Sequence, residues 1–154
     1  MLWLLLLTTG TTASLRGLSA VDDMIAWASG TKGTVIRTSN GGKTFTSITV
    51  PDAAGLDFRD VQAFSADHAI LMSAGPGPLS RIYITKDGGL HWKQTLTNKE
   101  EKGFYDSISF WNTKHGLLVN IPRQSRGPYF VSRSKRLNGV ANAAPTVVGH
   151  LAGG

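Results

Sequence analysis

The sequence contains no cysteine and only two glutamates, and it has no apolar run long enough to cross a membrane. The absence of cysteine excludes disulfides, thiolate catalysis and cysteine-based zinc sites, and it leaves the cellular compartment open. A membrane-spanning helix needs roughly 20 apolar residues. The apolar stretch at the amino end covers only residues 1–7, so we expect no transmembrane segment.

Charge is unevenly distributed along the 154 residues, whose net charge is +6. Residues 1–101 hold nine basic and nine acidic side chains, whereas residues 102–154 hold seven basic and one acidic. The basic stretch from Arg123 to Arg136 lacks any helix-turn-helix, zinc-finger or RNA-binding-sheet signature. We interpret it as a solvated tail with no specific nucleic-acid partner. Salt-sensitive contact with anionic surfaces is the alternative.

The clearest positive feature is a repeated turn pattern. Residues 38–45 (TSNGGKTF) and residues 85–92 (TKDGGLHW) lie 47 positions apart, and each copy follows a β-branched run. Asn-Gly and Asp-Gly are strong hairpin signals because these residues tolerate the positive φ angles of tight turns. The hydroxyl and the amide or carboxylate of each copy can bond to backbone groups inside the turn, and Phe45 and Trp92 are expected to anchor it by burial. A period of this size is typical of one propeller blade.

A second set of segments repeats with a similar period. Residues 15–21, 58–64 and 104–110 align with offsets of 43 and 46, which indicates about three units. Apolar residues recur at the ends of each segment and a turn follows, which is the pattern of short strands. In the first unit we expect strands over residues 15–21, 25–29, 34–38 and 44–50.

The octapeptides resemble the Asp-box, or bacterial neuraminidase repeat, with departures at Asn40, Phe45 and His91 that keep turn-forming or aromatic character. The wider context, Ala26 to Gly30 and Phe58 to Val61, is similar to the photosystem II stability/assembly factor-like family, over about residues 11–119. The resemblance assigns a structural role to the following residues: Thr38, Asn40, Gly42, Thr44, Phe45, Thr85, Asp87, Gly89, His91 and Trp92.

This resemblance implies an all-β fold, a partial β-propeller of about two and a half to three four-stranded antiparallel blades. The expected blades cover residues 14–52, 57–98 and 103–121, the last one incomplete, and residues 122–154 are expected to be a basic, weakly ordered tail. Closed propellers use about 4 to 8 blades. We therefore expect a fragment of a longer propeller, a ring completed by several copies, or an open stack whose exposed blade edges allow self-association.

The resemblance also implies a protein partner, because the assembly-factor-like family is associated with an arginine-rich binding patch. Arg16 and Arg59 take the same repeat position in the alignment, and Tyr105 takes that place in the third unit. Arginine can hold an acidic segment of a partner by bidentate contacts. Pairing of Arg59 with Asp57 or Asp60 is an equally weighted structural interpretation.

Catalytic arrangements have little support in the sequence. The sialidases, which also carry Asp-boxes, use an arginine triad and a Tyr/Glu pair, but Tyr83 and Tyr105 fall in expected strands without an identifiable activating glutamate. Asp57, Asp60 and Asp106 are candidates for paired acid and base, but Asp60 and Asp106 align with each other, which favours a turn-stabilising role. The four histidines are dispersed without metal-ligand spacing. We expect no enzyme activity, no cofactor and no metal site.

The amino end has two interpretations. Residues 1–13 can be a secretory signal peptide, since Thr11-Thr12-Ala13 resembles a small-residue cleavage site, or a truncated or misassigned start without a basic n-region. The family resemblance favours an extracytoplasmic location, periplasmic or secreted.

Three functional hypotheses follow. The first is a non-catalytic, propeller-type interaction module that helps to assemble or stabilise another complex. The second is a fragment of a sialidase-like glycoside hydrolase, whose missing part would supply Glu, Tyr and the arginine triad. The third is a truncated, non-functional product, because the repeat pattern stops after Leu118.

Overall fold

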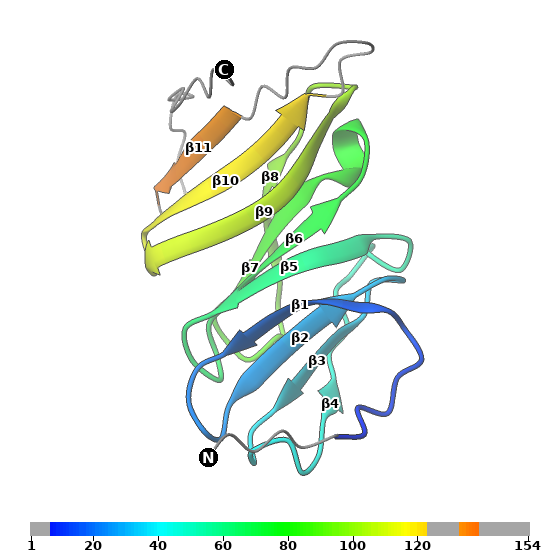
Figure 1. Cartoon of the computed structure of the whole chain (residues 1–154), viewed down its shortest axis with the longest axis vertical. Helices are drawn as coiled ribbons and strands as arrows, with labels where there is room; N and C mark the ends of the chain where they lie inside the picture. Colours follow the sequence, from blue (N-terminus) through cyan, green and yellow to red (C-terminus); the bar gives the residue numbers. More distant parts are fainter. Residues whose placement is uncertain (1–6, 123–132, 139–154) are drawn as a thin grey trace, which may run out of the picture.

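Three antiparallel β-sheets follow one another along the chain and stack along the long axis of the molecule (Figure 1). The computed structural model describes residues 7–122 and 133–138. Within these residues the secondary structure is strands and one short 3-10 helix. None of the described elements is a helix long and apolar enough to cross a membrane. The expected all-β class with propeller-like blades is confirmed.

The first sheet has the strand order β1-β2-β3-β4. Its strands are β1 (Leu15–Ala20), β2 (Ala26–Gly30), β3 (Val35–Thr38) and β4 (Thr46–Ser47). The fourth strand is much shorter than the expected range of 44–50. Beyond it, the Ile48 N–H still donates to Val35 O at 2.9 Å. The side chains of Ile48 and Val50 are buried in the core. Packing of these side chains, and not further strand pairing, therefore holds this segment in place.

The second sheet repeats this order as β5-β6-β7-β8. Its strands are β5 (Asp57–Ala63), β6 (Ala69–Ala74), β7 (Arg81–Thr85) and β8 (Lys93–Thr97). Between β6 and β7 lies the 3-10 helix η1 (Gly77–Leu79). Every residue of β6 except the last is buried, as expected for a strand covered on both faces.

The third sheet corrects the expectation for the C-terminal region. It contains β9 (Gly103–Asn112), β10 (His115–Pro122) and β11 (Arg133–Asn138), in the order β11-β10-β9. Residues 133–138 were expected to be weakly ordered, but they pair antiparallel with β10 from His115 to Asn120. Backbone groups alone form such a ladder, so a polar sequence can supply the strand. The remaining parts of the predicted tail, 123–132 and 139–154, lie outside the described residues.

Each first strand carries an irregularity at the same place, and β9 has a second one opposite His115 and Gly116. Pairing shifts between Leu15 and Gly17, between Phe58 and Asp60, and opposite β9 between Val119 and Asn120. The unpaired bulge residues are therefore Arg16, Arg59 and Asp106. The predicted alignment of Tyr105 with the two arginines is wrong by one residue. The offset from Arg59 to Asp106 is 47, which equals the spacing of the two turn octapeptides.

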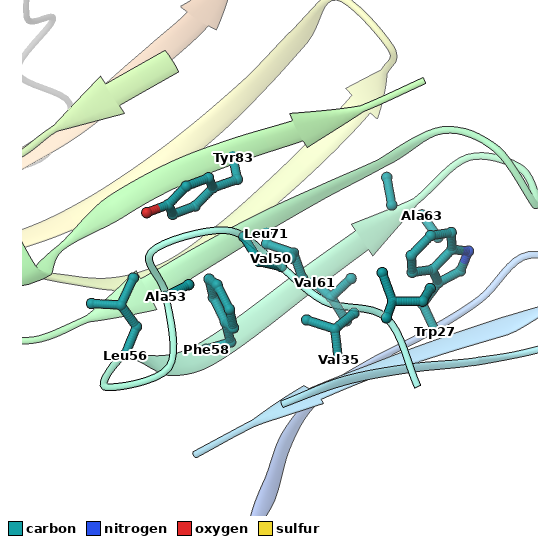
Figure 2. Close-up of a cluster of buried hydrophobic side chains, with 12 residues drawn as sticks. Trp27, Val35, Val50, Ala53, Leu56, Phe58, Val61, Ala63, Leu71 and Tyr83 are labelled. Atoms are coloured by element: carbon teal, nitrogen blue, oxygen red, sulfur yellow. The ribbon is translucent and has the colours of Figure 1, made fainter. Parts of the chain in front are cut away.

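The core lies between successive sheets, in two layers. Between the first and second sheets, Trp27 and Val35 face Phe58 and Val61, and all four are at most 3% exposed (Figure 2). Between the second and third sheets, the layer consists of Ile70, Met72, Ile82, Tyr105, Ile108 and Leu118. Burial of such side chains contributes about 1.5–3 kcal/mol each. Each sheet is therefore stabilised chiefly by its neighbour in the stack.

Polar contacts also connect the first two sheets. Trp27 Nε1 donates to Ser65 O at 3.2 Å, and Ser29 Oγ donates to Phe58 O at 3.1 Å. The Arg37 guanidinium donates to the carbonyls of Ala66 and Gly88 and lies 5.2 Å from the centre of the Trp27 ring. These bonds satisfy polar groups that the stacking of the sheets removes from water.

Candidate functional site

The first turn octapeptide closes through two side chains. Thr38 Oγ1 accepts from the Gly42 N–H at 2.9 Å and donates to Asn40 Oδ1 at 3.0 Å. Asn40 Oδ1 also accepts from the Thr44 N–H at 3.0 Å, and Asn40 Nδ2 donates to Thr44 Oγ1 at 2.8 Å. Gly41 and Gly42 have φ values of 69° and 81°, which glycine adopts without strain.

The second octapeptide repeats this geometry. Thr85 Oγ1 accepts from the Gly89 N–H at 2.9 Å and donates to Asp87 Oδ1 at 2.9 Å, which in turn accepts from the His91 N–H at 2.9 Å. Asp87 Oδ2 lies 2.7 Å from His91 Nδ1. The hydrogen bonds from His91, first from its backbone and then from its ring, lower the pKa of Asp87 to about 2.

The two aromatic positions of the octapeptides differ. Trp92 is half-buried and meets Trp27 edge-on with ring centres 6.3 Å apart, so it joins the core between the first two sheets. Phe45 is also half-buried, and it lies outside both core clusters. The hydroxyl, amide, carboxylate and imidazole groups that the resemblance singled out form their hydrogen bonds within the turns. The chemistry available to a ligand must therefore be sought elsewhere.

The bulge residues of the first strands form such a place. Arg16 Nε lies 3.1 Å from Asp57 Oδ1, and Arg59 Nη2 lies 3.1 Å from Asp106 Oδ1. Each pair joins one sheet to the next. The predicted alternative of pairing between Arg59 and Asp57 or Asp60 is wrong in its partners, because the carboxylate comes from the following sheet. All four side chains are between 33% and 43% exposed.

A pocket of about 220 Å³ opens beside these pairs. Its lining consists of Asp57, Arg59, Ala74, Gly75, Pro76 and Phe104. The Arg59 guanidinium lies 5.4 Å from the centre of the Phe104 ring, and this cation–π contact orients it. Asp57 Oδ1 is shielded from solvent and is held by its ion pair with Arg16 Nε. The pocket thus combines a cation with an aromatic face.

Tyr105 does not belong to this surface. Its side chain is 4% exposed and packs in the core between the second and third sheets. Burial, with a further contribution from the charge of Glu100, raises the pKa of Tyr105 to about 12. This places Tyr105 away from ligand binding, and it also makes the residue a poor nucleophile for sialidase-type chemistry. Tyr83 is buried as well, at 4%.

Asp60 and Asp106 do not stabilise turns as expected, because both lie within strands. Asp60 Oδ1 accepts from the Val61 N–H, and Asp60 Oδ2 accepts from the Ile108 N–H of the third sheet, both at 2.9 Å. Burial raises the pKa of Asp60, and the two backbone hydrogen bonds partly oppose that rise. Asp60 therefore connects the second and third sheets, while Asp106 pairs with Arg59.

Sequence reasoning found the two arginines and missed their surroundings. From the sequence, Asp57 is a neighbour of Arg59 or one of three candidate carboxylates, and Phe104 is only the start of a strand. The sequence does contain a signal for Asp106. The two turn octapeptides lie 47 positions apart, and the same offset from Arg59 leads to Asp106. The wall from Ala74 to Pro76 has no sequence signal for a pocket.

Two stacked four-stranded antiparallel sheets, each with an octapeptide turn between its third and fourth strands, and a third sheet stacked on them define the fold as part of a β-propeller. Two solved structures with this fold are similar to it: YCF48 bound to a D1 peptide, and YCF48 from Cyanidioschyzon merolae. The first has a TM-score of 0.70 and 20% sequence identity over 89% of this chain. The second has a TM-score of 0.66 and 20% identity over 90% of this chain.

YCF48 is a photosystem II assembly factor, so the expected similarity to that group is confirmed at the level of the fold. The chain spans about two fifths of the YCF48 chains, 41% in both comparisons. No family model matches the sequence, and no curated protein matches it.

Proposed function

We propose that the chain is a non-catalytic, propeller-type protein-interaction module of the assembly or stability factor kind, which binds an acidic peptide segment at Arg16 and Arg59. The pocket beside Arg59 is the observation that carries this proposal. It offers a guanidinium and an aromatic face, which suit the carboxylate and the side chain of an extended peptide.

The ion pairs do not oppose such binding. Pairs at this level of exposure contribute about 0–1 kcal/mol, so a guanidinium can exchange its partner at little cost. Each arginine also has more donors than its single carboxylate contact uses. A peptide carboxylate could therefore join or replace Asp57 or Asp106 without disturbing the sheets.

The likeness to YCF48 supports the proposal in kind, since one of the two structures holds a D1 peptide. The bound peptide is a property of YCF48, and a similarity of 20% identity supports only a shared fold for this chain. The peptide chemistry proposed for this chain therefore depends on its own residues. An extracytoplasmic location remains a prediction, to be checked by fractionating cells that produce the tagged protein.

The test is binding of a fluorescein-labelled Glu- and Ser-rich peptide, measured by anisotropy at low and high salt. The double variant Arg16→Gln/Arg59→Gln should weaken binding about tenfold or more, since hydrogen bonds to charged groups contribute about 1.5–3 kcal/mol each. Lys93→Gln removes an exposed charge from β8 of the same second sheet and should leave the affinity almost unchanged.

A matched peptide with Gln in place of Glu separates recognition of charge from nonspecific binding. Binding of the Gln peptide with equal affinity, or an unchanged affinity in the double variant at the same unfolding free energy, would contradict the proposal. Weaker binding at high salt is expected because the contacts are partly exposed.

A further inference from the structure

The two faces of each sheet have different partners in the stack. We call the face that packs on the preceding sheet the leading face, and the face that packs on the following sheet the trailing face. The bulge sets which residues of the first strand point each way, because it shifts the alternation by one residue. In chain order, the leading-face residues of the three first strands are Leu15, Leu18 and Ala20; Phe58, Val61 and Ala63; and Tyr105, Ile108 and Phe110.

These equivalent positions are buried where a preceding sheet exists. Phe58 is 0% exposed and Val61 3%, and in the third sheet Tyr105 and Ile108 are 4% and 8% exposed. In the first sheet the same positions are open: Leu18 is 76% exposed and Leu15 38%. Farther from β1 this face is already buried at Ala28 and Ile36. The open part of the leading face is therefore centred on β1.

On the trailing face, the exposed position lies at the other end of the stack, in the third sheet. Val21, Phe64 and Trp111 follow the bulges at equal spacing. Val21 packs on the core between the first and second sheets, and Phe64 meets Phe110 of the third sheet edge-on with ring centres 5.9 Å apart. Trp111 is 66% exposed.

Two neighbours on β10 show the same difference. Leu117 and Val119 are equivalent to Ile70 and Met72 of the second sheet, by their pairing with the first strand. Ile70 and Met72 are 2% and 0% exposed beneath the third sheet, whereas Leu117 and Val119 are only half-buried. The trailing face of the third sheet thus has the apolar composition of a sheet interface.

We propose that two copies of this chain associate head to tail, with the leading face at β1 of one copy packed on the trailing face of the third sheet of the other. The chain itself shows this combination of faces twice, between the first and second sheets and between the second and third. In the proposed contact, aliphatic residues on the leading face of one copy pack against an aromatic residue on the trailing face of the other, as they do between sheets within the chain. This interface differs from pairing of open strand edges, and it does not involve the peptide pocket.

Light scattering over a range of concentrations tests the proposal on the full chain. The mass should exceed that of the monomer and rise with concentration, because a heterologous contact can extend until it closes. Leu18→Lys and Trp111→Lys should each raise the Kd about tenfold or more, as for a central apolar contact. Leu90→Lys changes a leucine that is 81% exposed at the tip of the second turn and should have no effect. Ser109→Lys adds a charge to the trailing face without removing an apolar side chain and should also weaken association.

Mixing the variants decides the geometry. Leu18→Lys keeps an intact trailing face and Trp111→Lys keeps an intact leading face, so an equimolar mixture should form a heterodimer at concentrations at which each variant alone stays monomeric. A symmetric contact between two trailing faces would instead be insensitive to Leu18→Lys and would not be restored by mixing. That result, or a monomeric wild-type chain at every concentration, would overturn the proposal. Circular dichroism spectra equal to that of the wild type show that each variant is folded.

Discussion

Leu7 and Ile48 occupy the same place on the two turn octapeptides. Leu7 lies against Gly42 of the first turn, and Ile48 lies against Gly89 of the second, so close that a Cβ on either glycine would sit 2.3 Å or 2.4 Å from the aliphatic side chain. Ile48 belongs to the first sheet and covers the turn of the second. Leu7 thus covers the first turn as a residue of a preceding sheet would.

This relationship predicts the cost of filling the glycine sites. Gly42→Ala and Gly89→Ala should each destabilise the fold by at least roughly 1–2 kcal/mol, the cost of a left-handed backbone for an L-residue, because the new methyl group must also displace Leu7 or Ile48. Urea denaturation measures the effect. Gly55→Ala is the matched control, since nothing lies within 4 Å of its Cβ, and it should change stability little. An unchanged midpoint for Gly89→Ala would refute the packing argument.

Arg37 should stabilise the stack by connecting two sheets. Its guanidinium donates to the carbonyls of Ala66 and Gly88 and stacks on Trp27. Arg37→Met keeps the apolar stem and removes the donors, so we expect a loss of about 1–3 kcal/mol from the two carbonyls left without this donor. Lys43→Met, at an exposed position of the first turn, should stay within about 0.5 kcal/mol of the wild type. Equal unfolding free energies for both variants would show that Arg37 contributes nothing.

The second turn should lose stability in acid. Hydrogen bonds from His91 lower the pKa of Asp87 to about 2, below its ordinary value of 3.8. The folded state therefore holds the proton of Asp87 less tightly than the unfolded state, and the stabilisation is complete above 3.8 and lost as the pH falls through about 2. Asp87→Asn copies the amide that the first turn uses at Asn40. The stability of the wild type relative to this variant should fall between pH 5 and pH 2, and a constant difference would speak against the assigned hydrogen bonds.

The contribution of Asp60 to stability should depend on pH in the opposite direction to that of Asp87. Burial raises its pKa above 3.8, so the folded state holds this proton more tightly than the unfolded state. Its contribution to stability is fully present below 3.8 and is lost as the pH rises through the folded pKa. Carbon-detected NMR of the side-chain carboxyls should give a titration midpoint above 3.8 for Asp60 and far below it for Asp87. The reverse order of the two midpoints would contradict the burial of Asp60 between the second and third sheets.

Local features of the fold were predictable from the sequence. Asn40-Gly41 and Asp87-Gly88 specify hairpins through backbone angles that few residues tolerate, and their spacing shows the repeat. The shift from Tyr105 to Asp106 was missed because Phe104 and Asp106 match Phe58 and Asp60 by residue type, which favours an offset of 46 over the correct offset of 47. The strand Arg133–Asn138 was missed because pairing through backbone groups requires no alternation of side chains.

The candidate site was predictable only in part, for a related reason. Arg16 and Arg59 were found as a recurrence, but their partners Asp57 and Asp106 come from the following sheets. Neither the pocket beside Phe104 nor the buried carboxylate oxygen of Asp57 can be predicted from the sequence. Both exist because two sheets meet at a bulge.

By itself, the sequence determined the repeat, the two hydrogen-bonded turns and the all-β class, because these depend on backbone preferences and contacts within a few residues. Only the tertiary structure decided which carboxylate each arginine faces, that Tyr105 is buried, and that Leu18 and Trp111 are exposed in the first and third sheets. Those outcomes depend on how sheets pack, and packing brings together residues whose separation along the chain no local pattern encodes.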